Sequence, residues 1–321
     1  MSVEVKESQK QEITWAKVLL HLHLHIVGIY GLWVLLFYAK WMTVLFFFAL
    51  LSISYFGLTV GAHRLYAHRT YTASGIVRGF LVLAHTIAGV GKISNWVVDH
   101  RIHHQYYGTE HDPYNHKKGF WYSHILSNIL THPKKEEVKH SIDMRDIYDD
   151  GYIHIQNMLY LPLFIYFGVI LPVNAPFEYW DESLYVSLFV IGFLRLTITT
   201  QMAWLINSGY LVWNLKDGEH IPVKSRLVFL INKSYWPAYH YMVPWDWKTN
   251  EFGGYYAGCG RFFMKMMFEL GWIDKMVTAV DEDIRDILYK ISINEHTMKT
   301  GMEELHKMSE TRAINDVYRR G

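Results

Sequence analysis

Four long, nearly uncharged runs of residues constrain this chain more than any other feature of its sequence. Three of them, Val18–Ala39, Met42–Ala62 and Gln156–Pro176, contain no lysine, arginine, aspartate or glutamate, and the fourth, Leu184–Leu205, contains only Arg195. Each run is long enough to cross a hydrocarbon core of about 30 Å as an α-helix. A buried core helix explains one such run but not all four. We therefore predict an all-α integral membrane protein with four transmembrane helices.

The lysines and arginines predict the orientation of these helices, because these residues gather on the cytosolic side of a membrane. Eleven of them lie in His63–Ile155, whereas the short turns inside the two pairs of runs hold one and none. Both short turns are therefore expected in the lumen and both termini in the cytosol, where the middle segment forms a helical cap. We divide the chain into a cytosolic N-terminal tail (1–14), a membrane domain with its cap (15–276) and a charged C-terminal tail (277–321).

Charge and cysteine content exclude two other classes of protein. The formal net charge is +1 and the chain holds no concentrated basic patch, so we expect no nucleic-acid partner. Cys259 is the only cysteine, which excludes an intrachain disulfide and agrees with a cytosol-facing soluble portion.

Two clusters of histidines predict a metal centre. His100, His103 and His104 have the spacing of one helix face, so their imidazoles can converge on one or two metal ions. His63 and His68 are about 140° apart on an ideal helix. They converge only where the helix ends or deforms, or where a metal lies between its faces. Neutral imidazole suits iron, copper and zinc, and five histidines in two tight motifs are hard to explain as interfacial residues.

The residues around these histidines carry a family resemblance. The segments concerned are Gly61–Tyr71, Trp96–His104, Asp112–Asn115, Gly119–His124 and Trp204–Ser208. In this order they resemble the membrane acyl-CoA desaturases of the stearoyl-CoA (delta-9) type, and the similarity runs from about residue 14 to about residue 276. The resemblance implies a mushroom-like fold, in which four transmembrane helices carry a cytosolic cap.

The same resemblance implies an activity and its partners. It implies two irons per chain held by nine histidines, and the O₂-dependent insertion of a cis double bond into fatty acyl-CoA. It also implies cytochrome b5 as a separate electron donor, contact with membrane lipid, and a location in the endoplasmic reticulum membrane.

The resemblance assigns metal-site roles position by position. The residues that match ligands of the family, the asparagine acting through water, are His63, His68, His100, His103, His104, His240 and Asn207. Leu211, Pro237 and Tyr241 stand where the family has its three remaining ligand histidines. Leucine and proline cannot bind metal through their side chains, and a tyrosine with a pKa near 10 binds only at a cost. The third histidine motif is therefore degenerate.

Five further residues match the substrate side of the family, namely Trp96, Asp99, Lys117, Lys118 and Trp204. The two lysines resemble a phosphate contact for CoA, although lysines near anionic lipid explain them equally well. Val98 stands where the family has an arginine.

Three hypotheses follow from this pattern. The chain is a working acyl-CoA desaturase with an altered site, or a catalytically inactive pseudo-desaturase that binds acyl lipid or a partner desaturase. In a third hypothesis it keeps a metal but changes its chemistry, as a hydroxylase or as a zinc-bound structural site, for which four ligands suffice. The three lost ligands favour the second hypothesis over the first.

Overall fold

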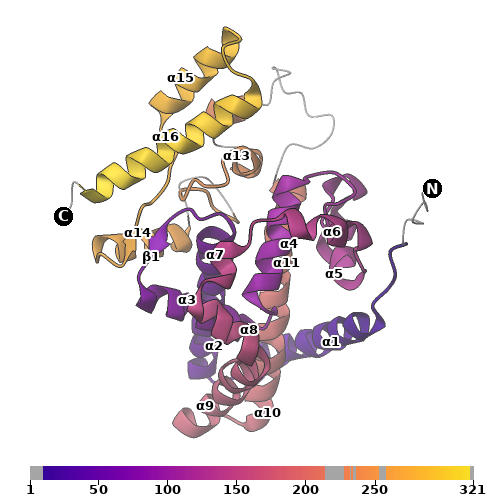
Figure 1. Ribbon diagram of the computed structural model, residues 1–321. Helices are drawn as coiled ribbons and strands as arrows, with labels where there is room; N and C mark the ends of the chain where they lie inside the picture. Colours follow the sequence, from indigo (N-terminus) through magenta and orange to yellow (C-terminus); the bar gives the residue numbers. More distant parts are fainter. Residues whose placement is uncertain (1–9, 214–227, 232, 234–235, 253–257, 319–321) are drawn as a thin grey trace.

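The computed structural model describes residues 10–213, 228–231, 233, 236–252 and 258–318 (Figure 1). Most of the predicted N-terminal tail, residues 1–9, lies outside this part of the chain. Two strands, β1 (Thr72–Ala73) and β2 (Ile273–Asp274), pair in antiparallel register, and the other elements are helical.

Four helices in the described part of the chain are long and apolar enough to cross a membrane, as the sequence predicts. The first is α1 (Trp15–Phe37). The other three join α-helical and π-helical segments end to end. The second consists of α2 (Trp41–Tyr55) and η1 (Phe56–Ala67). The third consists of α8 (Gly151–Leu163), η5 (Phe164–Ile170) and α9 (Leu171–Trp180). The fourth consists of α10 (Leu184–Ser187), η6 (Leu188–Leu194) and α11 (Arg195–Trp213).

The cap is made of shorter helices. Between the second and third spans the chain forms α3 (Gly75–Ala88), α4 (Ile93–Gln105), η2 (His116–Lys118), η3 (Tyr122–Leu126), α5 (Ser127–Ile129), α6 (Pro133–Val138), η4 (Lys139–Ser141) and α7 (Arg145–Tyr148). After the fourth span it forms α12 (Val228–Ile231), α13 (Trp236–Met242), α14 (Cys259–Glu269), α15 (Asp281–Ser292) and α16 (Met298–Tyr318). In Figure 1 the cap helices α13, α15 and α16 lie in the upper part, α14 lies beside β1, and α9 and α10 lie at the opposite end from α15 and α16.

The break between α3 and α4 sets the direction of the second histidine motif. Gly89 ends α3 in the left-handed conformation, with φ of 74°, which glycine adopts without steric cost. The chain then turns by 89° into α4. The two helices together are apolar enough to count as a broken span or a re-entrant segment.

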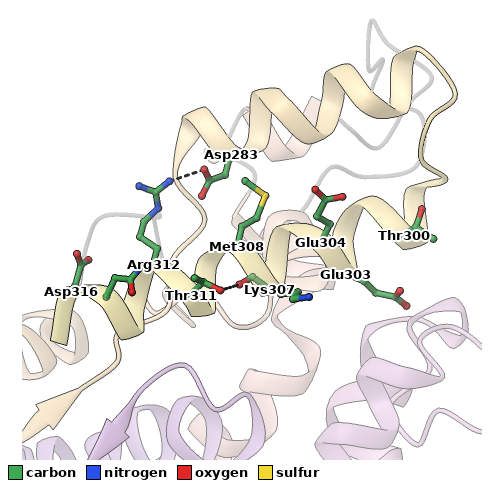
Figure 2. A pocket seen from close by; sticks show the side chains of 10 residues that line it. Asp283, Thr300, Glu303, Glu304, Lys307, Met308, Thr311, Arg312 and Asp316 are labelled. Carbon is green, nitrogen blue, oxygen red and sulfur yellow. Dashed lines mark hydrogen bonds and ion pairs between the residues drawn. The ribbon is translucent and has the colours of Figure 1, made fainter. Parts of the chain in front are cut away.

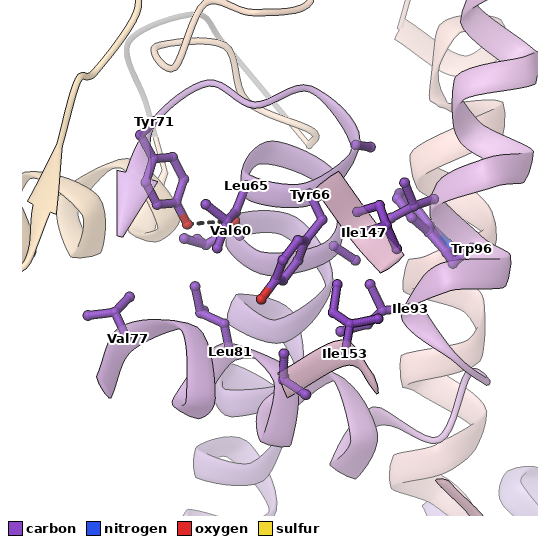
Figure 3. Close-up of a cluster of buried hydrophobic side chains, with 14 of the residues drawn as sticks. Val60, Leu65, Tyr66, Tyr71, Val77, Leu81, Ile93, Trp96, Ile147 and Ile153 are labelled. Atoms are coloured by element: carbon purple, nitrogen blue, oxygen red, sulfur yellow. Dashed lines mark hydrogen bonds between the residues drawn. The ribbon is translucent and has the colours of Figure 1, made fainter. Parts of the chain in front are cut away.

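One large apolar core joins the elements that carry both histidine motifs (Figure 3). In this cluster η1 contributes Val60 and Leu65, and α4 contributes Ile93 and Trp96. Figure 3 shows Ile153 from α8 beside them. Burying such side chains contributes about 1.5–3 kcal/mol each, so this core holds η1 and α4 in a fixed relation.

A buried arginine ties the fourth span to its neighbours. The Arg195 guanidinium donates hydrogen bonds to the carbonyls of Ile191 at 2.8 Å and Ile87 at 2.7 Å, and to that of Gly168. These carbonyls belong to η6, α3 and η5. Helices with π-turns leave carbonyls that an intramembrane donor can satisfy, which explains why a charged residue is placed here.

The charged C-terminal tail forms a packed pair of helices. Ile284 and Ile287 of α15 and Leu305 of α16 are buried in one cluster with Tyr239 of α13. On the outer side the two helices line an open groove of about 950 Å³, where the Arg312 guanidinium pairs with Asp283 at 2.7 Å (Figure 2). The C-terminal helices therefore support the segment that carries the last histidine of the predicted site.

The close crossing of η1 and α3 gives a test of the fold. A Cβ at Gly57 would lie 2.2 Å from the backbone nitrogen of His85 and 2.4 Å from the carbonyl carbon of Ala84. We predict that Gly57→Ala lowers the free energy of unfolding by about 1–3 kcal/mol, because backbone atoms must move. Gly151→Ala is the control, since no heavy atom lies within 4 Å of its added Cβ. Thermal unfolding in detergent would refute the prediction if both variants matched the parent protein.

Candidate metal centre

Five imidazoles gather where the second span meets the cap. Ligand atoms of His63, His68, His100 and His240 all lie within 4.8 Å of one another. The His68 Nε2 lies 3.1 Å from the His63 Nε2 and 2.8 Å from the His100 Nε2. The His104 ring lies 4.5 Å from the His68 ring, between centroids. The structure therefore brings together five of the six histidines that the sequence assigns to the site.

A π-helix explains why His63 and His68 converge. On an ideal α-helix they would point apart, but η1 is π-helical and its last turn closes with a hydrogen bond from the His68 N–H to the His63 carbonyl at 3.0 Å. A π-turn places residues five apart nearly above one another, and such turns occur frequently at functional sites. Of the three explanations that the sequence left open for the convergence of His63 and His68, the structure adopts the deformed helix.

Asn207 and Trp96 together orient the ring of His100. Asn207 Oδ1 accepts a hydrogen bond from the His100 Nδ1 at 2.8 Å, and the Trp96 ring stacks on His100 at 4.9 Å with an interplanar angle of 11°. The Nε2 lone pair of His100 then faces the other imidazoles. Asn207 thus supports a ligand ring directly, and the water-mediated contact with a metal stays a prediction.

Glu251 is a site residue that sequence reasoning missed. One of its oxygens accepts hydrogen bonds from the His63 Nδ1 and the Arg64 Nε, both at 2.8 Å, and the other lies 2.7 Å from an Arg64 Nη atom. Burial alone would raise the pKa of this carboxyl, but the Arg64 charge and the His63 hydrogen bond outweigh it and lower the pKa to about 2. No local spacing relates Glu251 to the histidine motifs, so only the fold reveals it.

His103 is the sixth histidine, and both of its nitrogens have protein partners. Its Nδ1 donates to Asp112 Oδ1 at 2.7 Å, and its Nε2 accepts from the Tyr241 hydroxyl at 2.5 Å. Burial raises the pKa of the Tyr241 hydroxyl well above its usual range, so the phenol keeps its proton. His103 therefore lies beside the five converging imidazoles, 5.7 Å from the His104 ring between centroids, with both nitrogens engaged by hydrogen bonds, although the resemblance assigns it a ligand role.

Two histidines keep a nitrogen without a protein partner. The His104 and His240 Nε2 atoms are buried and have no hydrogen-bond partner among the described residues. Leaving a buried polar atom unpaired costs about 1–3 kcal/mol, and a metal ion would satisfy both. The cavity beside them has a volume of about 20 Å³ and is lined by Pro237 and Tyr241 among other residues. Two of the three degenerate positions thus border the same small space, and Leu211 lies half-buried near the end of α11.

The predicted substrate residues fall into two groups. Trp96 and Trp204 are buried near histidine rings, the latter 4.9 Å from that of His21, between centroids. The Asp99 Oδ1 forms an ion pair with the Lys135 Nζ at 2.9 Å. Lys117 is exposed, as is Lys118, whose ammonium lies 4.4 Å from the centroid of the Tyr122 ring. Of the predicted substrate residues, only Lys118 borders a cavity of about 210 Å³, which is lined by Lys10, Gln11, Glu110, His111, Lys118, His132, Pro133, Lys134 and Lys135.

Other histidines that could replace lost ligands lie elsewhere. His85 contacts Gln156 inside the bundle, and His111 lies 3.7 Å from Glu137. His116 stacks on Tyr107. His220 lies outside the described residues.

Comparison with known proteins identifies the family. The Acyl-CoA Delta-12 desaturase of Tribolium castaneum is 33% identical over 277 residues, which cover 85% of this chain and 77% of that protein. The Delta(9)-fatty-acid desaturase fat-7 of Caenorhabditis elegans is 34% identical and covers 86% and 82%. The chain belongs to the acyl-CoA desaturase family. A further member, the Acyl-CoA desaturase of Cyprinus carpio, is 35% identical over 245 residues, or 75% of each chain. No family model matches the chain.

Membership in the acyl-CoA desaturase family agrees with the fold and with the histidines. The four apolar helices make the protein a multi-pass membrane protein, and the cluster of imidazoles is able to bind metal. The predicted family and fold class are therefore confirmed.

The buried pair of Arg64 and Glu251 gives a second test. We predict that Arg64→Met destabilises the protein by about 3–5 kcal/mol, because the carboxylate stays buried without its partner. Arg69→Met is the matched control, since its ion pair with Asp146 is half-exposed and contributes at most about 1 kcal/mol. Denaturation midpoints of the two variants, measured in the same detergent, check this prediction. Equal midpoints would contradict it.

Proposed function

We propose that this member of the acyl-CoA desaturase family binds fatty acyl-CoA in the membrane without inserting a double bond. The observation that carries the proposal is the contact between Tyr241 and His103. The phenol occupies the free nitrogen of a histidine that the family uses as a ligand. Desaturation in the family relies on two irons, which together supply the oxidising power to break an unactivated C–H bond. Among the described residues, the positions needed to complete the second iron site hold side chains that cannot bind, Leu211 and Pro237, or one that is engaged, His103.

A fatty acyl-CoA ligand is supported by the relatives and by charge. The similar proteins are named acyl-CoA desaturases. Lys10, Lys118, Lys134 and Lys135 border one cavity at the surface of the cap, beside the first residues of α1. Ammonium groups on flexible stems suit a phosphate-rich head group. Lys135 also bridges this cavity to Asp99 on α4, the helix of the second histidine motif.

The proposal includes a location and partners. We place the protein in the endoplasmic reticulum membrane with both termini in the cytosol, on the family resemblance and on the distribution of lysine and arginine. A second desaturase is the partner that an inactive relative would regulate. Cytochrome b5 belongs to the alternative, a working desaturase with an altered site. A hydroxylase would need the same oxidising centre, so the same contact argues against it.

The first test of the proposal is a lipid profile. We predict that cells without a desaturase of their own, supplied with cytochrome b5, make no monounsaturated fatty acids when they express this chain. The Acyl-CoA Delta-9 desaturase of Acheta domesticus, which is 33% identical to this chain, serves as the positive control. Monounsaturated lipids that disappear in a His63→Ala variant would overturn the proposal in favour of the working desaturase.

The second test measures ligand binding. We predict saturable binding of palmitoyl-CoA or stearoyl-CoA to the purified protein in detergent. Lys118→Glu is expected to weaken it at least about tenfold, because a hydrogen bond to a charged group contributes about 1.5–3 kcal/mol. Lys299→Glu, an exposed change on α16, is the control and is expected to leave the affinity unchanged. No saturable binding, or equal effects of both variants, would contradict an acyl-CoA function.

A further inference from the structure

We propose that the histidine cluster holds a single divalent transition-metal ion, and that His103 is not one of its ligands. The family resemblance implies a centre of two irons. The residues of this chain do not supply ligands for two ions, but they do supply ligands for one. This inference concerns the metal alone, and it stands whether or not the protein binds acyl-CoA.

The distances between the imidazole nitrogens fit ligands of one ion. Nitrogens bound to one ion at about 2.0–2.1 Å lie roughly 2.8–3.0 Å from each other as octahedral neighbours and roughly 3.3–3.4 Å apart in tetrahedral geometry. The His68 Nε2 lies 2.8 Å from that of His100 and 3.1 Å from that of His63. Two ions that share a site lie about 3.5–4 Å apart, and each needs its own set of ligands. The ligand atoms of His63, His68, His100 and His240 instead form one group, within 4.8 Å of one another.

The rings are also oriented for binding before any ion arrives. Glu251 and Asn207 each bond to the Nδ1 of a histidine, His63 and His100 respectively, which leaves the Nε2 atoms of both rings to face the cluster. The buried Nε2 atoms of His104 and His240 have no partner among the described residues. Together with His68 this makes up to five nitrogen donors, and four are enough for a closed site.

A second ion has no comparable ligand set among the described residues. His103 is bonded to Asp112 on one side and to Tyr241 on the other. Leu211 and Pro237 offer no side-chain lone pair. The cavity bordered by the histidines has a volume of only about 20 Å³.

The donor set also defines the class of metal. It consists of neutral imidazoles, with no thiolate and no carboxylate among the converging atoms. Imidazole suits iron, zinc, copper and nickel, while magnesium and calcium prefer oxygen ligands. The ion we expect is therefore a divalent first-row transition metal.

The metal content of the purified full-length protein tests this inference. We expect about one ion per chain, counting all first-row transition metals by inductively coupled plasma mass spectrometry after growth with iron and zinc. About two ions per chain would overturn the inference in favour of the family's centre. A content near zero, confirmed by the absence of Co²⁺ binding to the folded protein, would also overturn it.

Two histidine variants sharpen the test. His68→Asn is expected to weaken Co²⁺ binding at least about tenfold, because this ring lies at the centre of the cluster and the remaining donors must hold the ion without it. His103→Asn is expected to keep about one ion per chain. If His103→Asn lost its metal while staying folded, His103 would be a ligand and the inference would be wrong. Titration with Co²⁺, followed by its visible absorption, gives a stoichiometry that does not depend on enzymatic activity. A failure of acyl-CoA binding would leave this stoichiometry unchanged, so the two proposals can fail separately.

Discussion

The buried contact among Glu251, Arg64 and His63 is the constraint on which the candidate site depends. It joins the last part of the cap to the inner end of the second span, across 187 positions of sequence. A carboxylate and a guanidinium in bidentate contact compensate one another, which makes their burial tolerable. The same carboxylate fixes the ring of His63. Because one charged pair both closes the fold and aims a ligand, the geometry of the site and the stability of the cap are coupled.

Much of this structure could be predicted from the sequence, and the physical reason is clear. Membrane spans depend on the average polarity of some twenty residues, which the sequence displays directly. The cluster of histidines could also be predicted, because residue type and spacing can be read directly from the sequence. The roles of the individual ring nitrogens could not be predicted. The π-turn that aligns His63 with His68 is a property of the backbone, and the bond between His103 and Tyr241 joins residues 138 positions apart.

Tyr241, which the resemblance places at a ligand position of the family, is fully engaged by its neighbours. A tyrosine in place of a histidine does not leave a hole, because its ring fills the volume and its hydroxyl pairs with the neighbouring imidazole. A buried imidazole without a partner would be costly, so the substitution of Tyr241 for a ligand also repairs the hydrogen bonding that the loss of a metal would expose. The remaining histidines keep the arrangement that η1 and α4 impose on them.

The position of Arg195 has a consequence for how the protein is assembled. It lies in the fourth span, while two of its three carbonyl partners, Ile87 and Gly168, belong to elements that come earlier in the chain. The arginine alone costs about 2.5–3.5 kcal/mol at the centre of a bilayer. Insertion of the fourth span and its packing against α3 and η5 are therefore coupled, because the guanidinium finds its acceptors only on those neighbours.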